Sequence, residues 1–345
     1  MLEENIDLAG KTILITGAAG FIGAFLAKRL LEEHEDIQVI GFDNLNHYYD
    51  VSLKKKRLKM VNAYENFHFV KGELARKEHL NQVFERFHPE IVVNLAAQAG
   101  VRYSITNPEA YVESNLIGFF NVLECCRNVK VEHLLYASSS SVYGSNKKVP
   151  YAVGDKVDNP VSLYAATKKS NELMAHAYSK LYGIPSTGLR FFTVYGPMGR
   201  PDMAYFKFAD KIVKGETIQI YNHGDMYRDF TYIDDIITGV VRVISRKPEL
   251  TEDGVPYKIY NIGNSRPESL MNFVGILERL LTETGMVKGS VQKEYLPMQP
   301  GDVYQTYADV TELEYDIGFS PQMSLEDGLK KFVEWYSSVY SIGQI

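Results

Sequence analysis

A tyrosine and a lysine four positions apart, Tyr164 and Lys168, are the first candidates for chemistry in this sequence. On a helix both side chains would lie on one face and could reach one site. A neighbouring ammonium favours the ionised form of a phenol, so we expect Lys168 to lower the pKa of Tyr164 toward that of a general base. A serine run precedes the pair, and its Ser139 could relay the proton. On this spacing alone, an ordinary surface pair is the more frequent outcome.

A glycine-rich turn upstream gives the pair a context. Residues 11–16, with Ile-Leu-Ile at their centre, are typical of a short buried strand, and residues 21–31 follow a helical pattern. The glycines of the turn are Gly17, Gly20 and Gly23. A second predicted strand, residues 37–42, ends at Asp43. This order of elements predicts a dinucleotide site with the pyrophosphate at the helix N-terminus. Asp43 would accept hydrogen bonds from the adenosine ribose, which favours NAD over NADP; the alternative is a tight turn with an unrelated acid.

Strands and helices continue to alternate up to residue 192. Further strands are predicted at residues 67–71, 91–95, 133–137 and 186–192, and helices at 80–87, 107–126 and 158–181. The alternation predicts an α/β fold with a Rossmann-type, doubly wound parallel sheet. Shorter, mixed elements follow, so we expect a smaller mixed α/β lobe that binds the substrate. The predicted NAD-binding domain comprises residues 1–192 with a returning segment near 234–265, and the lobe comprises 193–233 and 266–345.

Composition narrows the possible functions. The chain has 345 residues, is 45% hydrophobic and 23% charged, and carries a net charge of −6, which argues against general nucleic-acid binding. Its two cysteines, Cys125 and Cys126, are adjacent and suit neither a zinc site nor a disulfide framework, so we expect no metal. Residues 1–10 do not resemble a signal peptide, and no stretch is apolar enough to span a bilayer. We therefore expect a cytoplasmic protein without membrane partners.

Several stretches, in the same order along the chain, resemble the extended short-chain dehydrogenase/reductases. Within that group they look like the UDP-glucuronate 4-epimerases, from residue 11 to about residue 336. The stretches that carry the resemblance are residues 43–50, 138–144, 192–203 and 228–235. One departure is His47, where the family more often has Asp; it lies near the adenosine end of the expected site.

The resemblance implies a cofactor site, a reaction and a homodimer. The implied cofactor-binding residues are Gly17, Gly20, Phe21, Ile22, Gly23, Asp43, Asn44, Glu73, Leu74, Leu95, Ala96, Ala97, Gln98, Asn115, Tyr164, Lys168 and Phe192. The implied reaction is NAD-dependent epimerisation at C4 of a UDP-hexuronic acid, UDP-glucuronate to and from UDP-galacturonate, through a transient 4-keto intermediate. Tyr164 would take the proton of the 4-hydroxyl, Ser139 would hold the 4-oxygen, and Lys168 would tune the phenol. Hydride would pass from C4 to tightly bound NAD and return to the opposite face after the sugar turns.

The implied substrate-binding residues are Ser139, Ser140, Ser141, Thr193, Arg200, Lys207, Tyr221, Arg228 and Asp302. Related dehydratases and decarboxylases carry an acid where this chain has Ser140 and Ser141, which argues for simple epimerisation. These serines and Thr193, with Arg200 nearby, would hold the sugar carboxylate. We hypothesise that they keep its bond to C5 out of line with the ketone, which prevents loss of carbon dioxide. The alternative for Arg200 is a structural salt bridge to Asp202.

The nucleotide half has its own predicted contacts. Arg228 would hold the diphosphate, Asp302 the uridine ribose and Tyr221 the uracil, with Lys207 in the same pocket. A half-buried strand aromatic explains Tyr221 equally well. Gln299 stands where UDP-galactose epimerases carry Arg, so diphosphate binding would depend more on Arg228.

Other assignments stay open. The alternatives are a UDP-galactose, UDP-N-acetyl sugar or UDP-pentose 4-epimerase, and a catalytically silent NAD-binding regulator. A homodimer would pair the helices at residues 109–126 and 164–181 into a four-helix bundle. The apolar residues that would permit it are Phe119, Leu123, Leu173 and Ala177, which the core of a monomer explains equally well.

Overall fold

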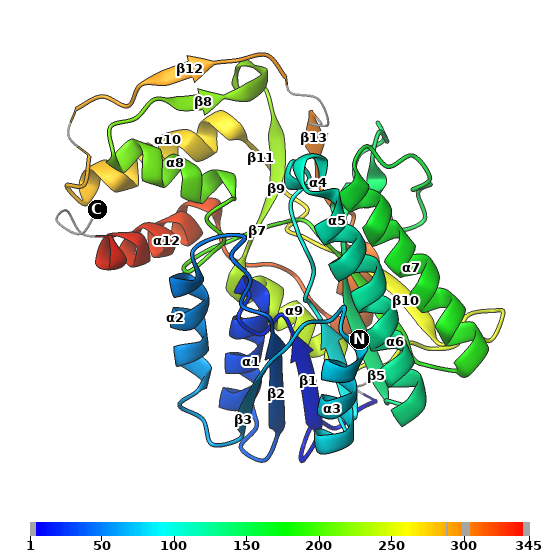
Figure 1. Cartoon of the computed structure of the whole chain (residues 1–345). Coiled ribbons are helices and arrows are strands. Elements are labelled where there is room, and N and C mark those ends of the chain that lie inside the picture. The colour runs from blue at the N-terminus through cyan, green and yellow to red at the C-terminus, as the bar shows by residue number, and fades with distance from the viewer. Residues whose placement is uncertain (1–4, 288, 299–303, 341–345) are drawn as a thin grey trace.

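A parallel sheet forms the centre of the computed structural model, which describes residues 5–287, 289–298 and 304–340. In the described chain this sheet has seven strands in the order β10-β6-β5-β4-β1-β2-β3 (Figure 1). They are β1 (Thr12–Thr16), β2 (Gln38–Asp43), β3 (Phe67–Lys71), β4 (Ile91–Asn94), β5 (His133–Ser139), β6 (Ser186–Phe191) and β10 (Tyr257–Ile262). The order reverses between β1 and β4, so the predicted doubly wound α/β fold is confirmed.

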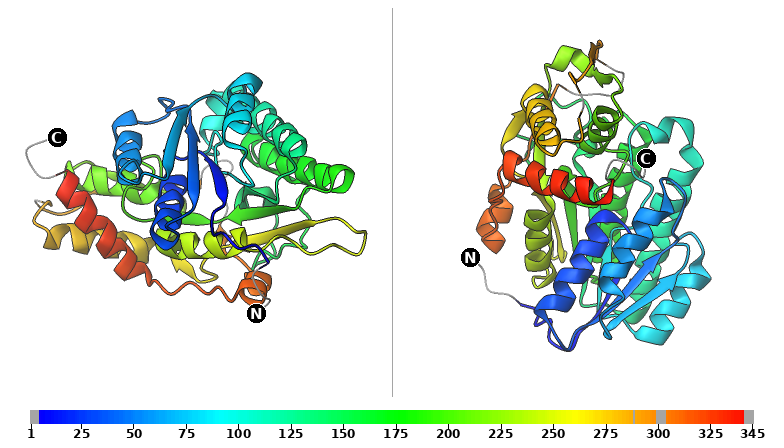
Figure 2. Two further views of the ribbon diagram at one scale, coloured as in Figure 1. Left: turned by 90° about the horizontal axis from the view of Figure 1, so that it is seen from below. Right: turned by 90° about the vertical axis from the view of Figure 1, so that its left-hand side faces the viewer.

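Helices cover both faces of the sheet, because successive strand residues point to opposite sides. Ile13 and Ile15 of β1 pack into one hydrophobic cluster, and Leu14 between them packs into another. The first cluster includes residues of α1 (Phe21–Glu33), α2 (Val51–Val61) and α9 (Ile233–Ile244). The second includes residues of α3 (Lys77–Phe87), α6 (Gly118–Val129) and α7 (Leu163–Tyr182). Figure 2 shows the sheet between these two layers. The strand termini of the sheet are therefore the places where a ligand can reach the backbone.

Two predicted helices differ from the structure. The predicted helix 107–126 is broken into α5 (Pro108–Tyr111), a π-helical segment (Val112–Ile117) and α6, with the short α4 (Tyr103–Thr106) before them. The helix that carries Tyr164 begins at Leu163 and not at residue 158. Ser162 caps it by accepting a hydrogen bond from the Ala165 amide at 3.1 Å. Pro160 keeps Asn159 out of the helical region, and the cap at Ser162 sets the start.

The helix residues that the sequence suggested for a dimer divide into two groups. Phe119 and Leu123 are buried in the core of the monomer, which is the second of the two explanations left open for them. Leu173 is 59% exposed, and Ala177 is exposed as well. Phe120, next to Phe119, is 43% exposed. The outer surface of α6 therefore exposes Phe120 and not the suggested Phe119 and Leu123. The outer surface of α7 exposes Leu173 and Ala177, as suggested.

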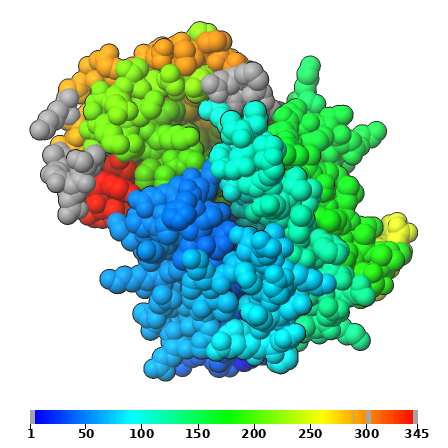
Figure 3. Space-filling view, in the orientation of Figure 1, coloured from blue at the N-terminus to red at the C-terminus, as the bar shows by residue number. Residues whose placement is uncertain are grey.

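A smaller set of elements lies above the carboxyl ends of the strands. It contains α8 (Ala204–Val213), β8 (Ile218–Ile220), α10 (Leu270–Glu283), β12 (Lys293–Tyr295) and α12 (Leu325–Val339) (Figure 1). A second small sheet is formed by β7 (Thr193–Tyr195), β9 (Tyr227–Tyr232), β11 (Pro267–Ser269) and β13 (Gln305–Thr306), and α11 (Thr311–Ile317) follows β13. Figure 3 shows a hollow between the light-green part of this region and the cyan segment around α4. The division into domains stays a prediction.

None of the helices in the described ranges combines the length and the apolar character that crossing a membrane would require.

Candidate active site

A cavity of about 470 Å³ opens at the carboxyl ends of β1, β2, β4 and β5. Most of the residues that the sequence suggested for the cofactor line it. They are Gly17, Gly20, Phe21, Ile22, Gly23, Asp43, Asn44, Glu73, Leu74, Leu95, Ala96, Ala97, Gln98, Tyr164, Lys168 and Phe192. Ser139, Ser140, Ser141, Thr193 and Arg200 from the predicted substrate set line the same cavity. The fold therefore brings the expected cofactor and sugar residues to one place.

The glycine turn leaves its backbone bare toward this cavity. Gly17 has a φ of +73°, and a Cβ there would lie 2.8 Å from the Ala96 amide nitrogen. A Cβ on Gly23 would clash with the carbonyl oxygen of Gly17. Only glycine fits at these positions, and the turn leads directly into the N-terminus of α1, where free amides favour an anion. The cradle is suited to the diphosphate of a dinucleotide.

Carboxylates lie at the ends of β2 and β3. Asp43 is buried and accepts hydrogen bonds from the amides of Ala19 at 3.1 Å and Leu45 at 2.8 Å. Glu73 accepts a hydrogen bond from the Asn44 side chain at 2.8 Å. Asp43 is thereby held against the glycine turn while still facing the cavity. Its predicted contact with a ribose is compatible with this position, because a carboxylate can accept more than two hydrogen bonds.

Asn115 does not line the cavity. It lies in the π-helical segment, where its side chain accepts a hydrogen bond from the Gln98 amide at 2.8 Å and donates to the Gln98 carbonyl at 3.0 Å. It also donates to the Thr167 hydroxyl at 3.0 Å, one turn along α7 from Tyr164. Asn115 thus fixes the segment after β4 against α7 from behind. Single π-helical turns of this kind are frequent at functional sites.

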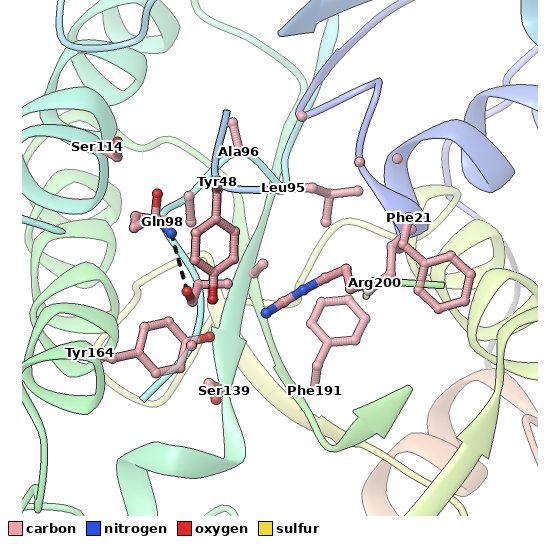
Figure 4. Close-up of a pocket in the computed structure, with 18 of the residues that line it drawn as sticks. Phe21, Tyr48, Leu95, Ala96, Gln98, Ser114, Ser139, Tyr164, Phe191 and Arg200 are labelled. Atoms are coloured by element: carbon pink, nitrogen blue, oxygen red, sulfur yellow. Dashed lines mark hydrogen bonds between the residues drawn. The ribbon is translucent and has the colours of Figure 1, made fainter. Parts of the chain in front are cut away.

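Ser139, Tyr164 and Lys168 come together at the end of β5. In Figure 4 the hydroxyls of Tyr164 and Ser139 and the guanidinium of Arg200 lie around one space, with Tyr48 across from them. The Ser141 amide donates to the Ser139 hydroxyl oxygen at 3.1 Å, and the Ser139 hydroxyl lies near enough to Tyr164 to lower the pKa of its phenol. Ser139 is therefore oriented to pass a proton to or from Tyr164.

The ionisation of this group differs from the prediction. Burial raises the pKa of Tyr164, and the nearby Ser139 hydroxyl and the charge of Arg200 offset this only in part. The expected lowering of the Tyr164 pKa by Lys168 is wrong, because the ammonium donates to the Ala137 carbonyl oxygen at 2.8 Å. Burial lowers the pKa of Lys168 itself to about 8. Lys168 can therefore change its protonation state near neutral pH, which suits a proton-transfer site.

A buried ion pair supports the catalytic group from behind. Arg190 on β6 donates to both carboxylate oxygens of Glu172 on α7, at 2.8 and 2.9 Å. Ser138 donates to the same carboxylate at 2.7 Å. Although burial raises the pKa of Glu172, the bonds and charge of Arg190 bring it below its usual value, so the pair is ionised. Glu172 follows Lys168 by one helical turn, so this network fixes α7 against the strand that ends at Ser139.

Arg200 forms the salt bridge that the sequence left open. Its guanidinium binds the Asp202 carboxylate at 3.0 and 2.5 Å, and Asp202 also accepts a hydrogen bond from the Tyr48 hydroxyl at 3.1 Å. Arg200 nevertheless lines the cavity beside Phe191. Its guanidinium has five N–H donors, so it can bind a second anion while it holds Asp202. Tyr48 and Asp202 thus hold Arg200 across the cavity from Tyr164.

Three of the predicted contacts to the nucleotide half belong to the described residues, and none of the three lines this cavity. Lys207 is exposed on α8. The ring of Tyr221 lies under the Arg102 guanidinium at 5.1 Å, so one of its faces is covered. Arg228 donates to the carbonyl oxygens of Tyr227 at 2.8 Å and Tyr304 at 3.2 Å. Asp302 and Gln299 lie outside the described residues.

Other residues that line the cavity were not predicted. They include Asn46, Tyr48, Tyr49, Lys54, Gly100, Val101, Ser114 and Met203. Most of these residues lie on the loops that follow β2 and β4, or at the start of α2. Tyr48 and Tyr49 belong to a stretch whose resemblance to a family was evident. Lys54 carries no sequence signal, because a lysine on a charged helix is normally exposed.

Comparisons with known proteins agree with this geometry. Residues 13–263 match the NAD dependent epimerase/dehydratase family. Protein CapI of Staphylococcus aureus is 52% identical over 339 residues, covering 95% of this chain and 99% of its own length. The probable UDP-glucuronate 4-epimerase of Rhizobium meliloti (strain 1021) is 46% identical over 340 residues, covering 95% and 97%.

A crystal structure gives the corresponding match in three dimensions. UDP-glucuronic acid 4-epimerase from Bacillus cereus, in complex with UDP-glucuronic acid and NAD, has a TM-score of 0.84 to this chain. The two sequences are 32% identical, and the match covers 95% of this chain and 100% of the other. From its glycine cradle, its Ser139–Tyr164–Lys168 group and these matches, we conclude that the chain belongs to the NAD dependent epimerase/dehydratase family.

Proposed function

We propose that this protein is a UDP-glucuronate 4-epimerase that uses tightly bound NAD to interconvert UDP-glucuronate and UDP-galacturonate. The observation that carries the proposal is that one cavity is lined both by the glycine cradle and by Ser139, Tyr164, Arg200 and the serines 140 and 141. The names of the relatives and of the matching crystal structure support the same substrate.

The side chains divide the work of the reaction. NAD, when bound, supplies the hydride chemistry at C4. Tyr164 takes the proton of the 4-hydroxyl and later returns it, and Ser139 bridges the sugar oxygen and the phenol. Lys168 holds a charge that can be lost near neutral pH, and its bond to Ala137 keeps it beneath this site. The cofactor-set residues that line the cavity would hold the dinucleotide, and Tyr164 lines the same cavity.

The far end of the cavity selects the sugar. Ser140, Ser141 and Thr193 donate to the carboxylate of a uronic acid, with Arg200 as the nearby positive charge. Among the described residues that line the cavity, the carboxylates are Asp43 and Glu73, both at the cofactor end. No acid of the described lining therefore stands where it could remove a proton from C5, which favours epimerisation over dehydration.

The substrate lobe and the assembly belong to the same proposal. Residues 193–233 and 266–345 form the lobe that binds the UDP group, with Lys207, Tyr221 and Arg228 approaching it when substrate is bound. Two copies pair through α6 and α7 in a cytoplasmic homodimer, for which the exposed Phe120 and Leu173 give support. Sedimentation of wild type and of Phe120→Lys tests the pairing, and a monomeric wild type would disprove it.

A direct assay tests the function. The purified protein is incubated with UDP-glucuronate and no added cofactor, and the products are separated by chromatography. UDP-galacturonate should appear, and the dinucleotide released by denaturation should be NAD. Parallel incubations with UDP-galactose, a UDP-N-acetyl sugar and a UDP-pentose distinguish the other epimerases. Bound NAD without turnover of any of these sugars would instead support a silent regulator.

A further inference from the structure

A fully buried arginine lies behind the glycine turn. Arg57 on α2 has no exposed surface, and its guanidinium lies 5.9 Å from the ring of Phe21 and 5.5 Å from that of Tyr49. A buried charge is costly unless a partner of opposite charge or a full set of hydrogen bonds compensates it. The partners of Arg57 therefore indicate what this cation is for.

Among the described residues, Arg57 has hydrogen-bond acceptors but no anionic partner. Its Nε and Nη2 donate to the Met198 carbonyl at 2.9 and 2.6 Å, and Nη2 also donates to Gly199 at 3.1 Å. Its Nη1 donates to the Ala19 carbonyl at 3.2 Å and to the Tyr49 hydroxyl at 2.6 Å. All five N–H groups are used, and every acceptor is neutral. Within the described part of the chain, no carboxylate lies at ion-pair distance from this guanidinium.

These acceptors belong to two separate parts of the site. Ala19 is in the glycine turn, and its amide is bound by Asp43 on the other side of the same residue. Met198 and Gly199 precede Arg200, the cation that faces the sugar end of the cavity. One guanidinium thus joins the cofactor cradle to the loop of residues 198–202. Lys54, one turn earlier on α2, lines the cavity on the same side.

We propose that Arg57 is a positioning residue whose missing counter-charge is the diphosphate of the bound dinucleotide, and that it transmits cofactor binding to the loop of residues 198–202. The inference rests on the proposed binding of NAD in this cavity. An anion in the glycine turn would compensate the buried cation, because opposite charges attract strongly where water is excluded. The compensated guanidinium would in turn hold the carbonyls of Met198 and Gly199, and with them Arg200, in place.

A purely structural clip is the competing explanation, and charge separates the two. A clip needs the hydrogen bonds of Arg57 but no anion in the cavity. Its loss would weaken the protein equally with and without a dinucleotide. If the diphosphate balances the charge of Arg57, this cation stabilises the protein more when the diphosphate is bound. Loss of Arg57 should then reduce the stabilisation that the ligand gives to the protein.

Three full-length variants supply the test. Arg57→Met removes the charge and all the donors at similar length, Arg57→Lys keeps a charge with fewer donors, and Lys56→Met removes an exposed cation from the same helix as a control. The first measurement is the exchange of labelled NAD out of each holoenzyme into excess unlabelled NAD. The second, on protein from which NAD has been removed, is the rise in melting temperature caused by ADP-ribose, which has the diphosphate, and by adenosine, which lacks it.

We expect NAD to exchange roughly tenfold or more faster from Arg57→Met than from wild type and Lys56→Met. The rise caused by ADP-ribose should shrink in Arg57→Met and be largely kept in Arg57→Lys, while the rise caused by adenosine should be similar in all. An equal loss of the adenosine and ADP-ribose effects in Arg57→Met would overturn the charge role. If Arg57→Met does not fold, loss of the ADP-ribose effect in Arg57→Lys would overturn that role in its place.

Hydrogen exchange tests the transmission to the loop without any sugar. In wild type and in Lys56→Met, NAD should slow exchange of the amides at residues 198–202. In both Arg57 variants this slowing should be lost or much reduced, because neither retains the planar fork of donors. An undiminished slowing would disprove the coupling. None of these measurements depends on which sugar the enzyme accepts, so a failure of the proposed substrate would not be mistaken for a failure of this inference.

Discussion

The Lys168 ammonium donates to the carbonyl oxygen of Ala137, two residues before Ser139, at 2.8 Å. The lysine that was expected to act on a neighbouring phenol instead fastens α7 to the end of β5. Burial nonetheless leaves it with a pKa of about 8. Its charge is thus available to the site and sensitive to pH.

This pKa gives stability a defined pH dependence. Lysine in an unfolded chain has a pKa near 10.4, so between about pH 8 and pH 10 the unfolded state binds a proton that the folded state does not. Through this residue, the free energy of unfolding should rise with pH over that window, by up to about 3 kcal/mol. The difference in unfolding free energy between wild type and Lys168→Met, from urea titrations at pH 7.5 and 10, isolates the effect from other groups. Lys180→Met, at the exposed end of α7, should show no such change, and an identical result for both variants would contradict the assignment.

Removal of the phenol should stop catalysis without unfolding the protein. Tyr164→Phe loses the proton acceptor, so turnover of UDP-glucuronate should fall by about 10²–10⁴-fold, and Ser139→Ala should fall within the same range. Both proteins should keep their NAD. Rates follow from chromatography of the sugar products, with Tyr178→Phe on the same helix as the control. Undiminished turnover by Tyr164→Phe would remove this residue from the mechanism.

The carboxylate contacts should protect the intermediate. A uronic acid oxidised at C4 is a β-keto acid, which loses carbon dioxide when its carboxylate bond aligns with the ketone. The triple variant Ser140→Ala, Ser141→Ala, Thr193→Ala should therefore release a UDP-pentose and carbon dioxide beside the epimer. Mass spectrometry of the nucleotide sugars detects the by-product, and Ser145→Ala, exposed next to this segment, serves as the control. If the triple variant forms no pentose, the serines and Thr193 do not have this role.

The glycine turn should not tolerate a methyl group. Gly23→Ala would press a Cβ against the Gly17 carbonyl, so we expect NAD to be lost during purification and the melting temperature to fall. Gly275→Ala in α10 is the matched control, because its added Cβ would meet nothing within 4 Å beyond its chain neighbours and the backbone of its own helix. That change should stabilise the protein by about 0.5–1 kcal/mol through helix propensity. Full retention of NAD by Gly23→Ala would show that the turn does not hold the cofactor closely.

Breaking the buried ion pair of Glu172 and Arg190 should lower the free energy of unfolding more than breaking any exposed ion pair. Glu172→Ala leaves a buried guanidinium without its counter-ion, at a cost of about 3–5 kcal/mol. Ser138→Ala, which removes one hydrogen bond to the same carboxylate, should cost about 1–3 kcal/mol. Urea denaturation measures both. A cost for Glu172→Ala below that for Ser138→Ala would mean that the pair contributes little.

The sequence predicted the sheet well because buried parallel strands consist mostly of apolar residues, which form recognisable runs in the sequence. Apolar runs such as residues 91–93 can hardly be exposed, and the glycine turn indicated the point where the first helix starts. The helix α2 escaped prediction for the opposite reason. Its sequence carries five cations, and two of them, Lys54 and Arg57, are buried. Arg57 bonds to residues far away in the chain, Ala19 and Met198 among them. Composition alone indicates a solvated segment there.

The sequence predicted the site residues that follow the ends of strands. It did not predict the features of the site that depend on tertiary packing. Ser139 and Tyr164 line the cavity as their positions implied. The π-helical segment that holds Asn115 contains no proline or glycine, so its sequence does not indicate a break in the helix. The pKa of Tyr164 depends on burial and on Arg200, neither of which a spacing of four residues can reveal. Arg200 with Asp202 was foreseen only as an alternative.

The late position of β10 in the chain has a consequence for synthesis. β6 is buried along its whole length, yet its outer neighbour, β10, begins only at Tyr257. A ribosome-bound chain that ends before that residue would present β6 as an open edge with unpaired amides and carbonyls, which invites aggregation. Chains truncated near residue 192 should therefore be insoluble, and the nascent protein should need chaperone protection until residue 262 has emerged.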